Sequence, residues 1–358
     1  MAYITLDTVK LRENFNFLDK IFKHEGIQWA VVSKILCGNR LFLQELLNLD
    51  IQQVCDSRVS NLRAIKKMSP EIETIYIKPP PARSIPDVVK YADISFNTEY
   101  STLKLISDEA GRQGKIHKVV IMLEMGELRE GVMRDDFIEF YRNVFTLPNI
   151  NVVGIGTNLN CLYGVLPNHD KLIQLSLYEQ LIEARFNKQI PYVSGGSSVS
   201  IPLIFERLLP KGINHFRVGE TLFLGTDVYH DSTIPEMHND VFMLYAEIIE
   251  LIEKPTIPMG EMGTNLEGHT FEFSDSDTGK TSFRAIIDLG LLDVESEHLK
   301  PVDPQVEFVG SSSDMIVIDL GRNERNYKTG DLIEFNLDYM GILRIMHSRY
   351  IEKRLSQR

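Results

Sequence analysis

The stretch WAVVSKILCGN, residues 29–39, is apolar through its first half and then carries a lysine, Lys34, where a strand is expected to end. Short apolar runs of this kind are typical of buried strands. Lysines often end strands by extending their charge to water, and a single ammonium group specifies no chemistry. Taken alone, Lys34 therefore leaves two interpretations open: a solvated strand-end charge and the reactive amine of a site.

Seven further β-rich runs follow, separated by helical patterns such as NLRAIKKM (61–68) and DKLIQLSLYEQLI (170–182). The runs are IQQVCDS (51–57), TIYIKPP (74–80), ADISFNT (92–98), KVVIMLEMG (118–126), NVVGIGTNLN (151–160), YVSGG (192–196) and HFRVG (215–219). Apolar strands that alternate with helices indicate a parallel sheet covered on both faces. Eight such units predict a TIM-like (β/α)8 barrel over residues 8–237.

The pattern changes after residue 237, where β runs are separated by Gly, Pro and Asp turns. The runs are AEIIELI (246–252), FRAIIDLG (283–290), QVEFVG (305–310), MIVIDLG (315–321), GDLIEFNL (330–337) and GILRIM (341–346). We predict a second, mostly-β domain over residues 238–358. The opening strand-like segment, residues 1–7, is assigned to the same domain.

Composition narrows the functional classes. The 358 residues carry a formal charge of −12, which argues against a nucleic-acid partner. Three scattered cysteines, Cys37, Cys55 and Cys161, are too few for a disulfide framework or a cysteine metal knot and favour a reducing compartment. No signal core or membrane span is evident, so we expect a cytoplasmic protein with no membrane partner.

Three barrel ends together favour one cofactor. Active sites of such barrels lie at the carboxyl ends of the strands, and the loops after strands seven and eight often cradle phosphate. Here these loops are VSGGSSVS (193–200) and HFRVGE (215–220). The first alone is most often a turn, and Arg217 alone is most often an ion pair. Together with Lys34 they suggest pyridoxal 5'-phosphate, with Arg217 as partner of its ring nitrogen.

Motifs along nearly the whole chain resemble those of the alanine racemase superfamily of fold-type III pyridoxal phosphate enzymes, and within it those of the ornithine racemase group. They are VVSKILCGN (31–39), DSRVSNL (56–62), ADISFNTE (92–99), GELREGV (126–132), GIGTNLNCLYGVLPN (154–168), SGGSS (194–198), INHFRVGE (213–220) and GSSSD (310–314). The resemblance implies a racemase that takes an amino acid as its small-molecule substrate and forms a head-to-tail homodimer.

The resemblance also implies roles for particular residues. Lys34 matches the lysine that holds the cofactor covalently and carries a proton on one face. Arg129 matches the arginine near the ring hydroxyl, Asn158 falls where alanine racemases have a histidine, and Arg217 matches the arginine that faces the ring nitrogen. The remaining matches are phosphate contacts, namely Ser194, Gly195, Gly196, Ser197, Ser198, Gly219 and Glu220.

The C-terminal motifs depart from the family pattern. Alanine racemases take a second base from a tyrosine of the partner subunit, whereas the comparable stretch here, residues 258–271, has no tyrosine. GLLD (290–293) and SSDM (312–315) stand where the ornithine group has motifs like GRQD and SSDH. Asp314 is the candidate second base. It is also a candidate ligand for the ω-amine of a basic substrate, or a turn aspartate, with Tyr339 and His347 as the next candidates.

Three functions are weighed. The first is an amino-acid racemase that transfers a proton at Cα, acting on a basic amino acid such as ornithine, or on alanine. The second is a non-catalytic pyridoxal phosphate carrier, which would lack the second domain. The third is a fold-type III lyase that holds a metal with a His/Cys pair. Beyond residue 238 the chain has His269, His298 and His347 but no cysteine, so no metal is expected.

Overall fold

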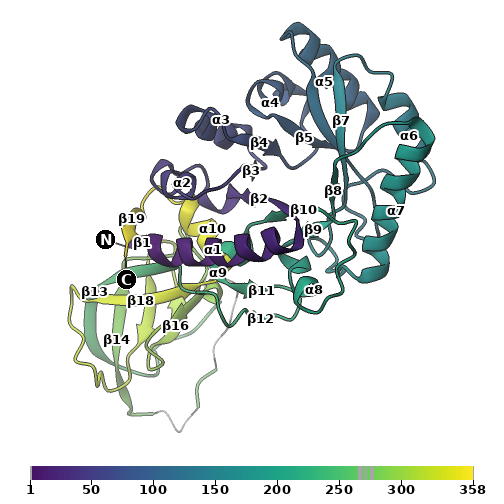
Figure 1. Cartoon of the computed structure of the whole chain (residues 1–358). Coiled ribbons are helices and arrows are strands. Elements are labelled where there is room, and N and C mark those ends of the chain that lie inside the picture. Colours follow the sequence, from purple (N-terminus) through teal and green to yellow (C-terminus); the bar gives the residue numbers. More distant parts are fainter. Residues whose placement is uncertain (1, 265–267, 269, 271, 275–277, 358) are drawn as a thin grey trace. The chain divides into compact units, whose positions relative to one another are not determined.

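The computed structural model describes residues 2–264, 268, 270, 272–274 and 278–357 (Figure 1). The chain divides into two compact units. One comprises Val9–Asn239, and the other comprises Met1–Thr8 with Asp240–Arg358.

The larger unit is built on parallel strands in the order β8-β7-β6-β5-β4-β3-β2-β10-β9. Their bounds are β2 (Gln28–Val32), β3 (Gln53–Asp56), β4 (Glu73–Tyr76), β5 (Ile94–Asn97), β6 (His117–Met122), β7 (Ile150–Gly156), β8 (Tyr192–Ser194), β9 (Gly196–Ser197) and β10 (His215–Val218). This nearly closed TIM-like barrel confirms the predicted fold class. All eight predicted β runs of the barrel contain an observed strand.

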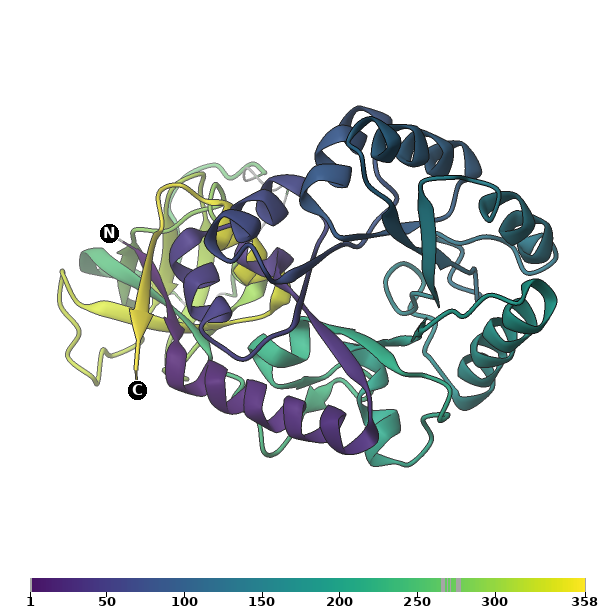
Figure 2. The same cartoon turned by 45° about the horizontal axis from the view of Figure 1, so that its top comes forward.

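Helices surround the strands of this unit, as the turned view in Figure 2 shows. They are α1 (Thr8–Glu25), α2 (Arg40–Leu47), α3 (Val59–Met68), α4 (Ile85–Tyr91), α5 (Tyr100–Arg112), α6 (Phe137–Val144), α7 (His169–Phe186), α8 (Pro202–Phe205) and α9 (Glu220–Leu224). Helix α1 is amphipathic. Its residues Leu11, Phe15, Leu18 and Phe22 are buried, because spacings of three and four residues place them on one face.

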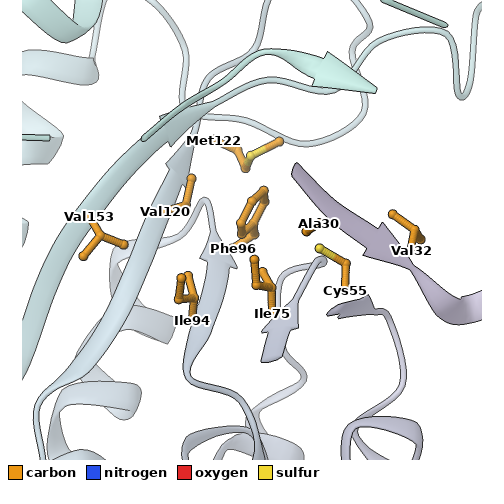
Figure 3. Close-up of a cluster of buried hydrophobic side chains, with 9 residues drawn as sticks. All are labelled: Ala30, Val32, Cys55, Ile75, Ile94, Phe96, Val120, Met122 and Val153. Carbon is orange, nitrogen blue, oxygen red and sulfur yellow. The ribbon is translucent and has the colours of Figure 1, made fainter. Parts of the chain in front are cut away.

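The interior of the barrel is a packed apolar core. Nine buried side chains contributed by β2 to β7 form one cluster (Figure 3). They are Ala30, Val32, Cys55, Ile75, Ile94, Phe96, Val120, Met122 and Val153. The core leaves the polar strand ends and their loops as the place where chemistry can occur.

The ring closes through one interrupted strand. β8 pairs with β7, with Ser194 opposite Gly156, whereas β9 pairs with β10, with Gly196 opposite Phe216. Gly195 separates β8 from β9 and lets the chain change partners. A methyl group on Gly196 would lie 2.2 to 2.3 Å from three ring carbons of Phe216. Close packing against this ring therefore requires glycine at position 196.

The smaller unit is an antiparallel sheet with one parallel pair, β1 with β19. Its path is β15-β18-β13-β14-β17-β16, and β1 pairs with β13 as well as β19. The strands are β1 (Tyr3–Asp7), β13 (Phe242–Pro255), β14 (Thr281–Ile287), β15 (Leu299–Pro301), β16 (Glu307–Ser311), β17 (Ile316–Asp319), β18 (Leu332–Leu337) and β19 (Glu352–Ser356). The predicted C-terminal β architecture is confirmed.

One predicted strand of this unit is wrong. Residues 341–346, GILRIM, lie in helix α10 (Tyr339–His347). The Asp338 side chain caps the helix by accepting a hydrogen bond from the Gly341 amide at 2.7 Å. Ile342, Ile345 and Met346 are buried at helical spacing. The apolar run was too short to distinguish a strand from a helix by its pattern.

We expect Gly196→Ala to lower the free energy of unfolding by about 1–3 kcal/mol, because the added methyl overpacks the contact with Phe216. Gly310→Ala is the matched control, since a methyl there has no atom within 4 Å. Urea unfolding of the two variants and the parent measures the difference. Equal stability of all three proteins would show that the β9–β10 contact is not constrained in this way.

Candidate functional site

Lys34 lies just beyond the end of β2, in a short 3₁₀ turn (Ser33–Leu36), and its side chain is exposed. The turn is anchored from below. The Ser33 hydroxyl donates to the Cys55 carbonyl at 3.2 Å and lies 2.9 Å from Oδ2 of Asp56. Asp56 also accepts from the Arg58 amide at 2.8 Å and from Nδ2 of Asn61 at 3.2 Å. Burial raises the pKa of Asp56, while these donors lower it. Asp56 thus orders the turn that carries Lys34.

Arg217 is buried inside the barrel, 7% exposed, on the strand next to that of Lys34. Its Nη2 donates to the Thr157 carbonyl at 2.6 Å, and its guanidinium carbon lies 5.0 Å from the ring centre of Phe96. Burial lowers the pKa of Arg217 from its ordinary value. Two further atoms here, Nε of Arg217 and Oγ1 of Thr157, are buried and have no hydrogen-bond partner among the described residues. A polar ligand would complete both groups.

Arg129 and Asn158 meet across two neighbouring loops, those after β6 and β7. With its amide oxygen toward Arg129, Asn158 accepts hydrogen bonds of 2.5 Å from Nη2 and 3.2 Å from Nη1. The Cys161 sulfur lies 3.2 Å from the same amide. Arg129 also donates to Glu130, which is the main reason that its pKa is raised. The structure therefore brings these two predicted site residues together.

Ser194 is a predicted phosphate contact, but its hydroxyl bonds to the side chain of His215. Its Oγ lies 2.8 Å from Nδ1 of His215, and Nε2 of His215 lies 3.0 Å from Oε1 of Gln53. All three side chains are buried. Burial, with a smaller effect of the Arg217 charge, lowers the pKa of His215 to about 3. His215 is therefore neutral at ordinary pH, and the Ser194 hydroxyl belongs to this polar network rather than to an anion site.

The other cradle residues are partly occupied by local contacts. Ser197 caps a short 3₁₀ turn (Ser198–Ser200), and the Ser198 hydroxyl accepts from the Thr221 amide at 3.3 Å. Gly195 and Gly196 are closely packed on the outer side of the strand. Gly219 precedes α9, whose first residue is Glu220, and a methyl on Gly219 would lie 3.1 Å from Cβ of Val32. The loops after β9 and β10 are thus joined by the Ser198–Thr221 contact.

Asp314 lies in the other unit, in the turn between β16 and β17, and its side chain is exposed. This turn pairs with the GLLD loop. The Leu291 amide donates to the Ser312 carbonyl at 3.0 Å, and the Leu292 amide to the Ser313 carbonyl at 2.8 Å. A methyl on Gly290 would lie 2.4 to 2.5 Å from the Asp314 backbone. The two departing motifs therefore form one local structure.

The remaining candidates divide between described and undescribed residues. Tyr339 and His347 begin and end α10, and Nδ1 of His298 lies 2.9 Å from Oδ2 of Asp338. His269 and parts of the stretch 258–271 lie outside the described residues. In the described part of the chain, no three His, Cys, Asp or Glu side chains are grouped to hold a metal ion.

Sequence reasoning missed four contributors to the site. They are Asp56 as an anchor, Phe96 and Thr157 around Arg217, and Glu127, a buried carboxylate beside the β7–α7 loop. Asp56 and Glu127 lie in two of the motifs quoted for the family resemblance, but nothing in the spacing of these motifs distinguishes a buried carboxylate from a loop charge.

Across the described residues, no helix is both long and apolar enough to span a membrane.

Comparison with known proteins agrees with the geometry. Residues 6–227 match the family model of the alanine racemase N-terminal domain. An ornithine racemase of Acetoanaerobium sticklandii is 38% identical over 98% of this chain and 99% of its own. A lysine racemase of Thermotoga maritima is 30% identical over 98% of this chain and 97% of its own.

Solved structures share the fold at low sequence identity. An alanine racemase of Clostridium difficile has a TM-score of 0.75 at 13% identity, covering 99% of this chain and 96% of its own. An alanine racemase of Bartonella henselae, described with covalently bound pyridoxal phosphate, has a TM-score of 0.74 at 16% identity, with 99% of each chain covered. A D-threonine aldolase of Filomicrobium marinum has a TM-score of 0.69 at 14% identity, covering 98% of this chain and 91% of its own.

The neutral His215 predicts a loss of stability in acid. Below about pH 6.5 the unfolded chain protonates this histidine while the folded chain does not, down to about 3. One such proton contributes a slope of about 1.4 kcal/mol per pH unit, with stability falling as the pH falls. We expect His215→Gln, which keeps a donor and an acceptor, to reduce that slope by about one proton.

Urea unfolding of both proteins between about pH 4 and 6 tests this expectation, because that interval lies between the folded and the unfolded pKa of His215. His117, whose pKa burial lowers to about 4, is retained in the variant, so a residual slope is expected. Identical slopes for parent and variant would contradict a neutral, buried His215.

Proposed function

The chain belongs to the alanine racemase family, and we propose that it interconverts the L- and D-forms of a basic amino acid such as ornithine or lysine. The observation that carries the proposal is full-length similarity to an ornithine racemase and a lysine racemase. The barrel supplies a lysine just beyond the end of β2 and a buried arginine on the adjacent strand β10. Alanine is the second substrate to test.

The residues present suit pyridoxal 5'-phosphate. Nε of Arg217 is a buried donor and Oγ1 of Thr157 a buried hydroxyl, and neither has a hydrogen-bond partner among the described residues, so a polar ring could supply one. Arg129 and Asn158 would contact the same group from the neighbouring loops. Ser197, Ser198 and the backbone of Gly195, Gly196, Gly219 and Glu220 would hold its phosphate, while Ser194 would contribute through its backbone. When bound, pyridoxal phosphate supplies an electron sink that acidifies the hydrogen on the substrate α-carbon.

Each side chain then has a defined task. The Lys34 amine would hold the cofactor, and it would remove or return the proton on one face of the substrate α-carbon. The Arg217 guanidinium stays protonated, and beside the ring nitrogen of the cofactor it would disfavour a proton there. Restraint of that kind favours proton exchange at the α-carbon over decarboxylation or transamination. A second group must serve the opposite face.

Asp314 is our candidate for the opposite face or for the substrate side chain. It is exposed on a turn that backbone bonds to Leu291 and Leu292 hold in place. A carboxylate can accept a proton as a base, and it also matches the ω-ammonium of ornithine or lysine. These two roles predict different substrate profiles. The homodimer implied by the family resemblance and a cytoplasmic location stay predictions.

A lyase is the second candidate, because a D-threonine aldolase shares the fold. That likeness concerns the fold alone, and the metal expected for such lyases has no group of three ligands among the described residues. A cofactor carrier is the third candidate. The full-length similarity to racemases, second domain included, favours an enzyme over a carrier.

The direct test is a chiral assay of purified protein with added pyridoxal phosphate. We expect interconversion of the two forms of ornithine or lysine, and a loss of at least about 10³-fold in kcat for Lys34→Ala, because removal of the group that carries the proton has an effect of this order. Lys78→Ala, at another strand end, is the control. Full activity in Lys34→Ala would contradict the assignment, and inactivity of the parent on all amino acids would contradict the function.

Asp314→Asn separates the two roles of that carboxylate. As the base it should lose about 10²-fold or more in turnover, more in one direction than in the other. As the ω-amine ligand it should raise KM for ornithine and lysine while sparing alanine. Steady-state kinetics in both directions on the three substrates provides the measurement. Unchanged kinetics throughout would leave Asp314 as a turn residue and direct attention to Tyr339 and His347.

A further inference from the structure

We propose that Glu127 is a positioning residue of this site, whose carboxylate anchors the loop between β7 and α7 and thereby holds Asn158 and Cys161 against Arg129. The inference rests on the proposed function only for its catalytic consequence. Its structural part stands on the contacts of the barrel alone. Among the described residues Glu127 bonds to backbone amides of the loop, so we expect its effect to be transmitted through the loop.

The anchor consists of five backbone amides that point at one side chain. Oε1 of Glu127 accepts from the amides of Cys161 (2.8 Å), Leu162 (2.5 Å) and Tyr163 (2.9 Å), and Oε2 accepts from those of Asn160 (3.2 Å) and Val165 (3.1 Å). Glu127 is 1% exposed. The Asn160 amide also donates to the Val165 carbonyl at 3.0 Å, whereas the other four amides would need new partners without this carboxylate. Glu127 therefore organises the segment 160–165.

Only an ionised carboxylate matches this arrangement, because it accepts at both oxygens and donates at neither. Burial alone would raise the pKa of Glu127, but the amide bonds from the loop outweigh it and lower the pKa. A glutamine has the same shape yet presents an amide NH₂ to part of the donor set. Glu127→Gln is therefore a nearly isosteric change that removes the anchor.

Glu127 is held rigidly in its own loop. The Val132 amide donates to the Met122 carbonyl at 2.8 Å, and the Glu124 amide to the Val132 carbonyl at 3.0 Å. Lys171 donates from Nζ to the Met125 carbonyl at 2.8 Å. Such contacts make the loop a fixed base from which the carboxylate reaches its partners.

Leu128, between Glu127 and Arg129, has a left-handed φ of +54°. A residue other than glycine adopts this conformation only where its surroundings impose it. The turn at Leu128 joins the anchor to the functional arginine within three consecutive residues. Displacement of the β7–α7 loop would therefore separate Asn158 from Arg129, while the barrel strands stay in place.

The loop carries its own reporter. Cys161 is exposed, Cys37 is half-buried and Cys55 is buried. Alkylation with iodoacetamide, mapped by peptide mass spectrometry, therefore follows Cys161 specifically. Amide hydrogen exchange of residues 160–165 gives a second readout, and neither measurement needs cofactor or substrate.

We expect Glu127→Gln in the full-length protein to exchange these loop amides about tenfold faster or more and to change the Cys161 alkylation rate, because a charge-assisted set of bonds is lost. With pyridoxal phosphate and a substrate that the parent racemises, kcat should fall by about tenfold or more. Glu127→Asp, which keeps the charge but is shorter, should fall between parent and Glu127→Gln in both readouts, and serves alone if the glutamine variant does not fold.

Glu183→Gln is the matched control, since Glu183 accepts a single backbone bond, 2.8 Å from the Ile190 amide, beyond the last turn of α7. It should leave the exchange of residues 160–165, Cys161 alkylation and kcat unchanged. Unaltered loop exchange in Glu127→Gln would overturn the anchor. A loosened loop with parental kcat would overturn the positioning role. Inactivity of the parent would instead contradict the proposed function and leave the loop result standing.

Discussion

Closure of the barrel depends on the segment from Tyr192 to Ser197, which pairs with β7 in its first half and with β10 in its second. The change of partner occurs at Gly195, and Gly196 admits the ring of Phe216. Without that step β10 would have no neighbour on one side, and Arg217 would not reach the Thr157 carbonyl beyond the end of β7. The site is therefore a consequence of how the ring closes.

Burial of a guanidinium costs free energy unless its N–H groups have hydrogen-bond partners. In Arg217 only some of these groups have one. Nη2 of Arg217 binds the Thr157 carbonyl and the Phe96 ring lies below the charge, whereas Nε has no partner among the described residues. His215, two residues earlier on β10, differs from Arg217 because it is neutral and has a hydrogen-bond partner at both ring nitrogens. The polar groups around His215 therefore bond to one another, whereas near Arg217 one donor remains for a ligand.

Sequence reasoning reached the barrel because each strand is a short apolar run followed by a polar residue and a helix. Lys34 and Arg217 could be predicted as site residues from the same pattern, since the carboxyl ends of the strands of such a barrel lie on one rim. The Ser194–His215 hydrogen bond could not be predicted from the sequence, because the directions of these two side chains depend on how the barrel closes. The role of Glu127 was missed because its five partners are backbone amides, which do not depend on the residue types of the loop. The helix at 341–346 was missed because its cap, Asp338, lies outside the apolar run.

The central claim is that this rim binds pyridoxal phosphate through Lys34, with Arg217 facing the ring. Incubation of the purified protein with pyridoxal phosphate, reduction with borohydride and peptide mapping tests it most directly, because the reduction fixes the pyridoxal group to the lysine that holds it. The account predicts a single pyridoxyl group, on the peptide that contains Lys34. A modification on another lysine, such as Lys78 or Lys171, with Lys34 unmodified, would contradict it.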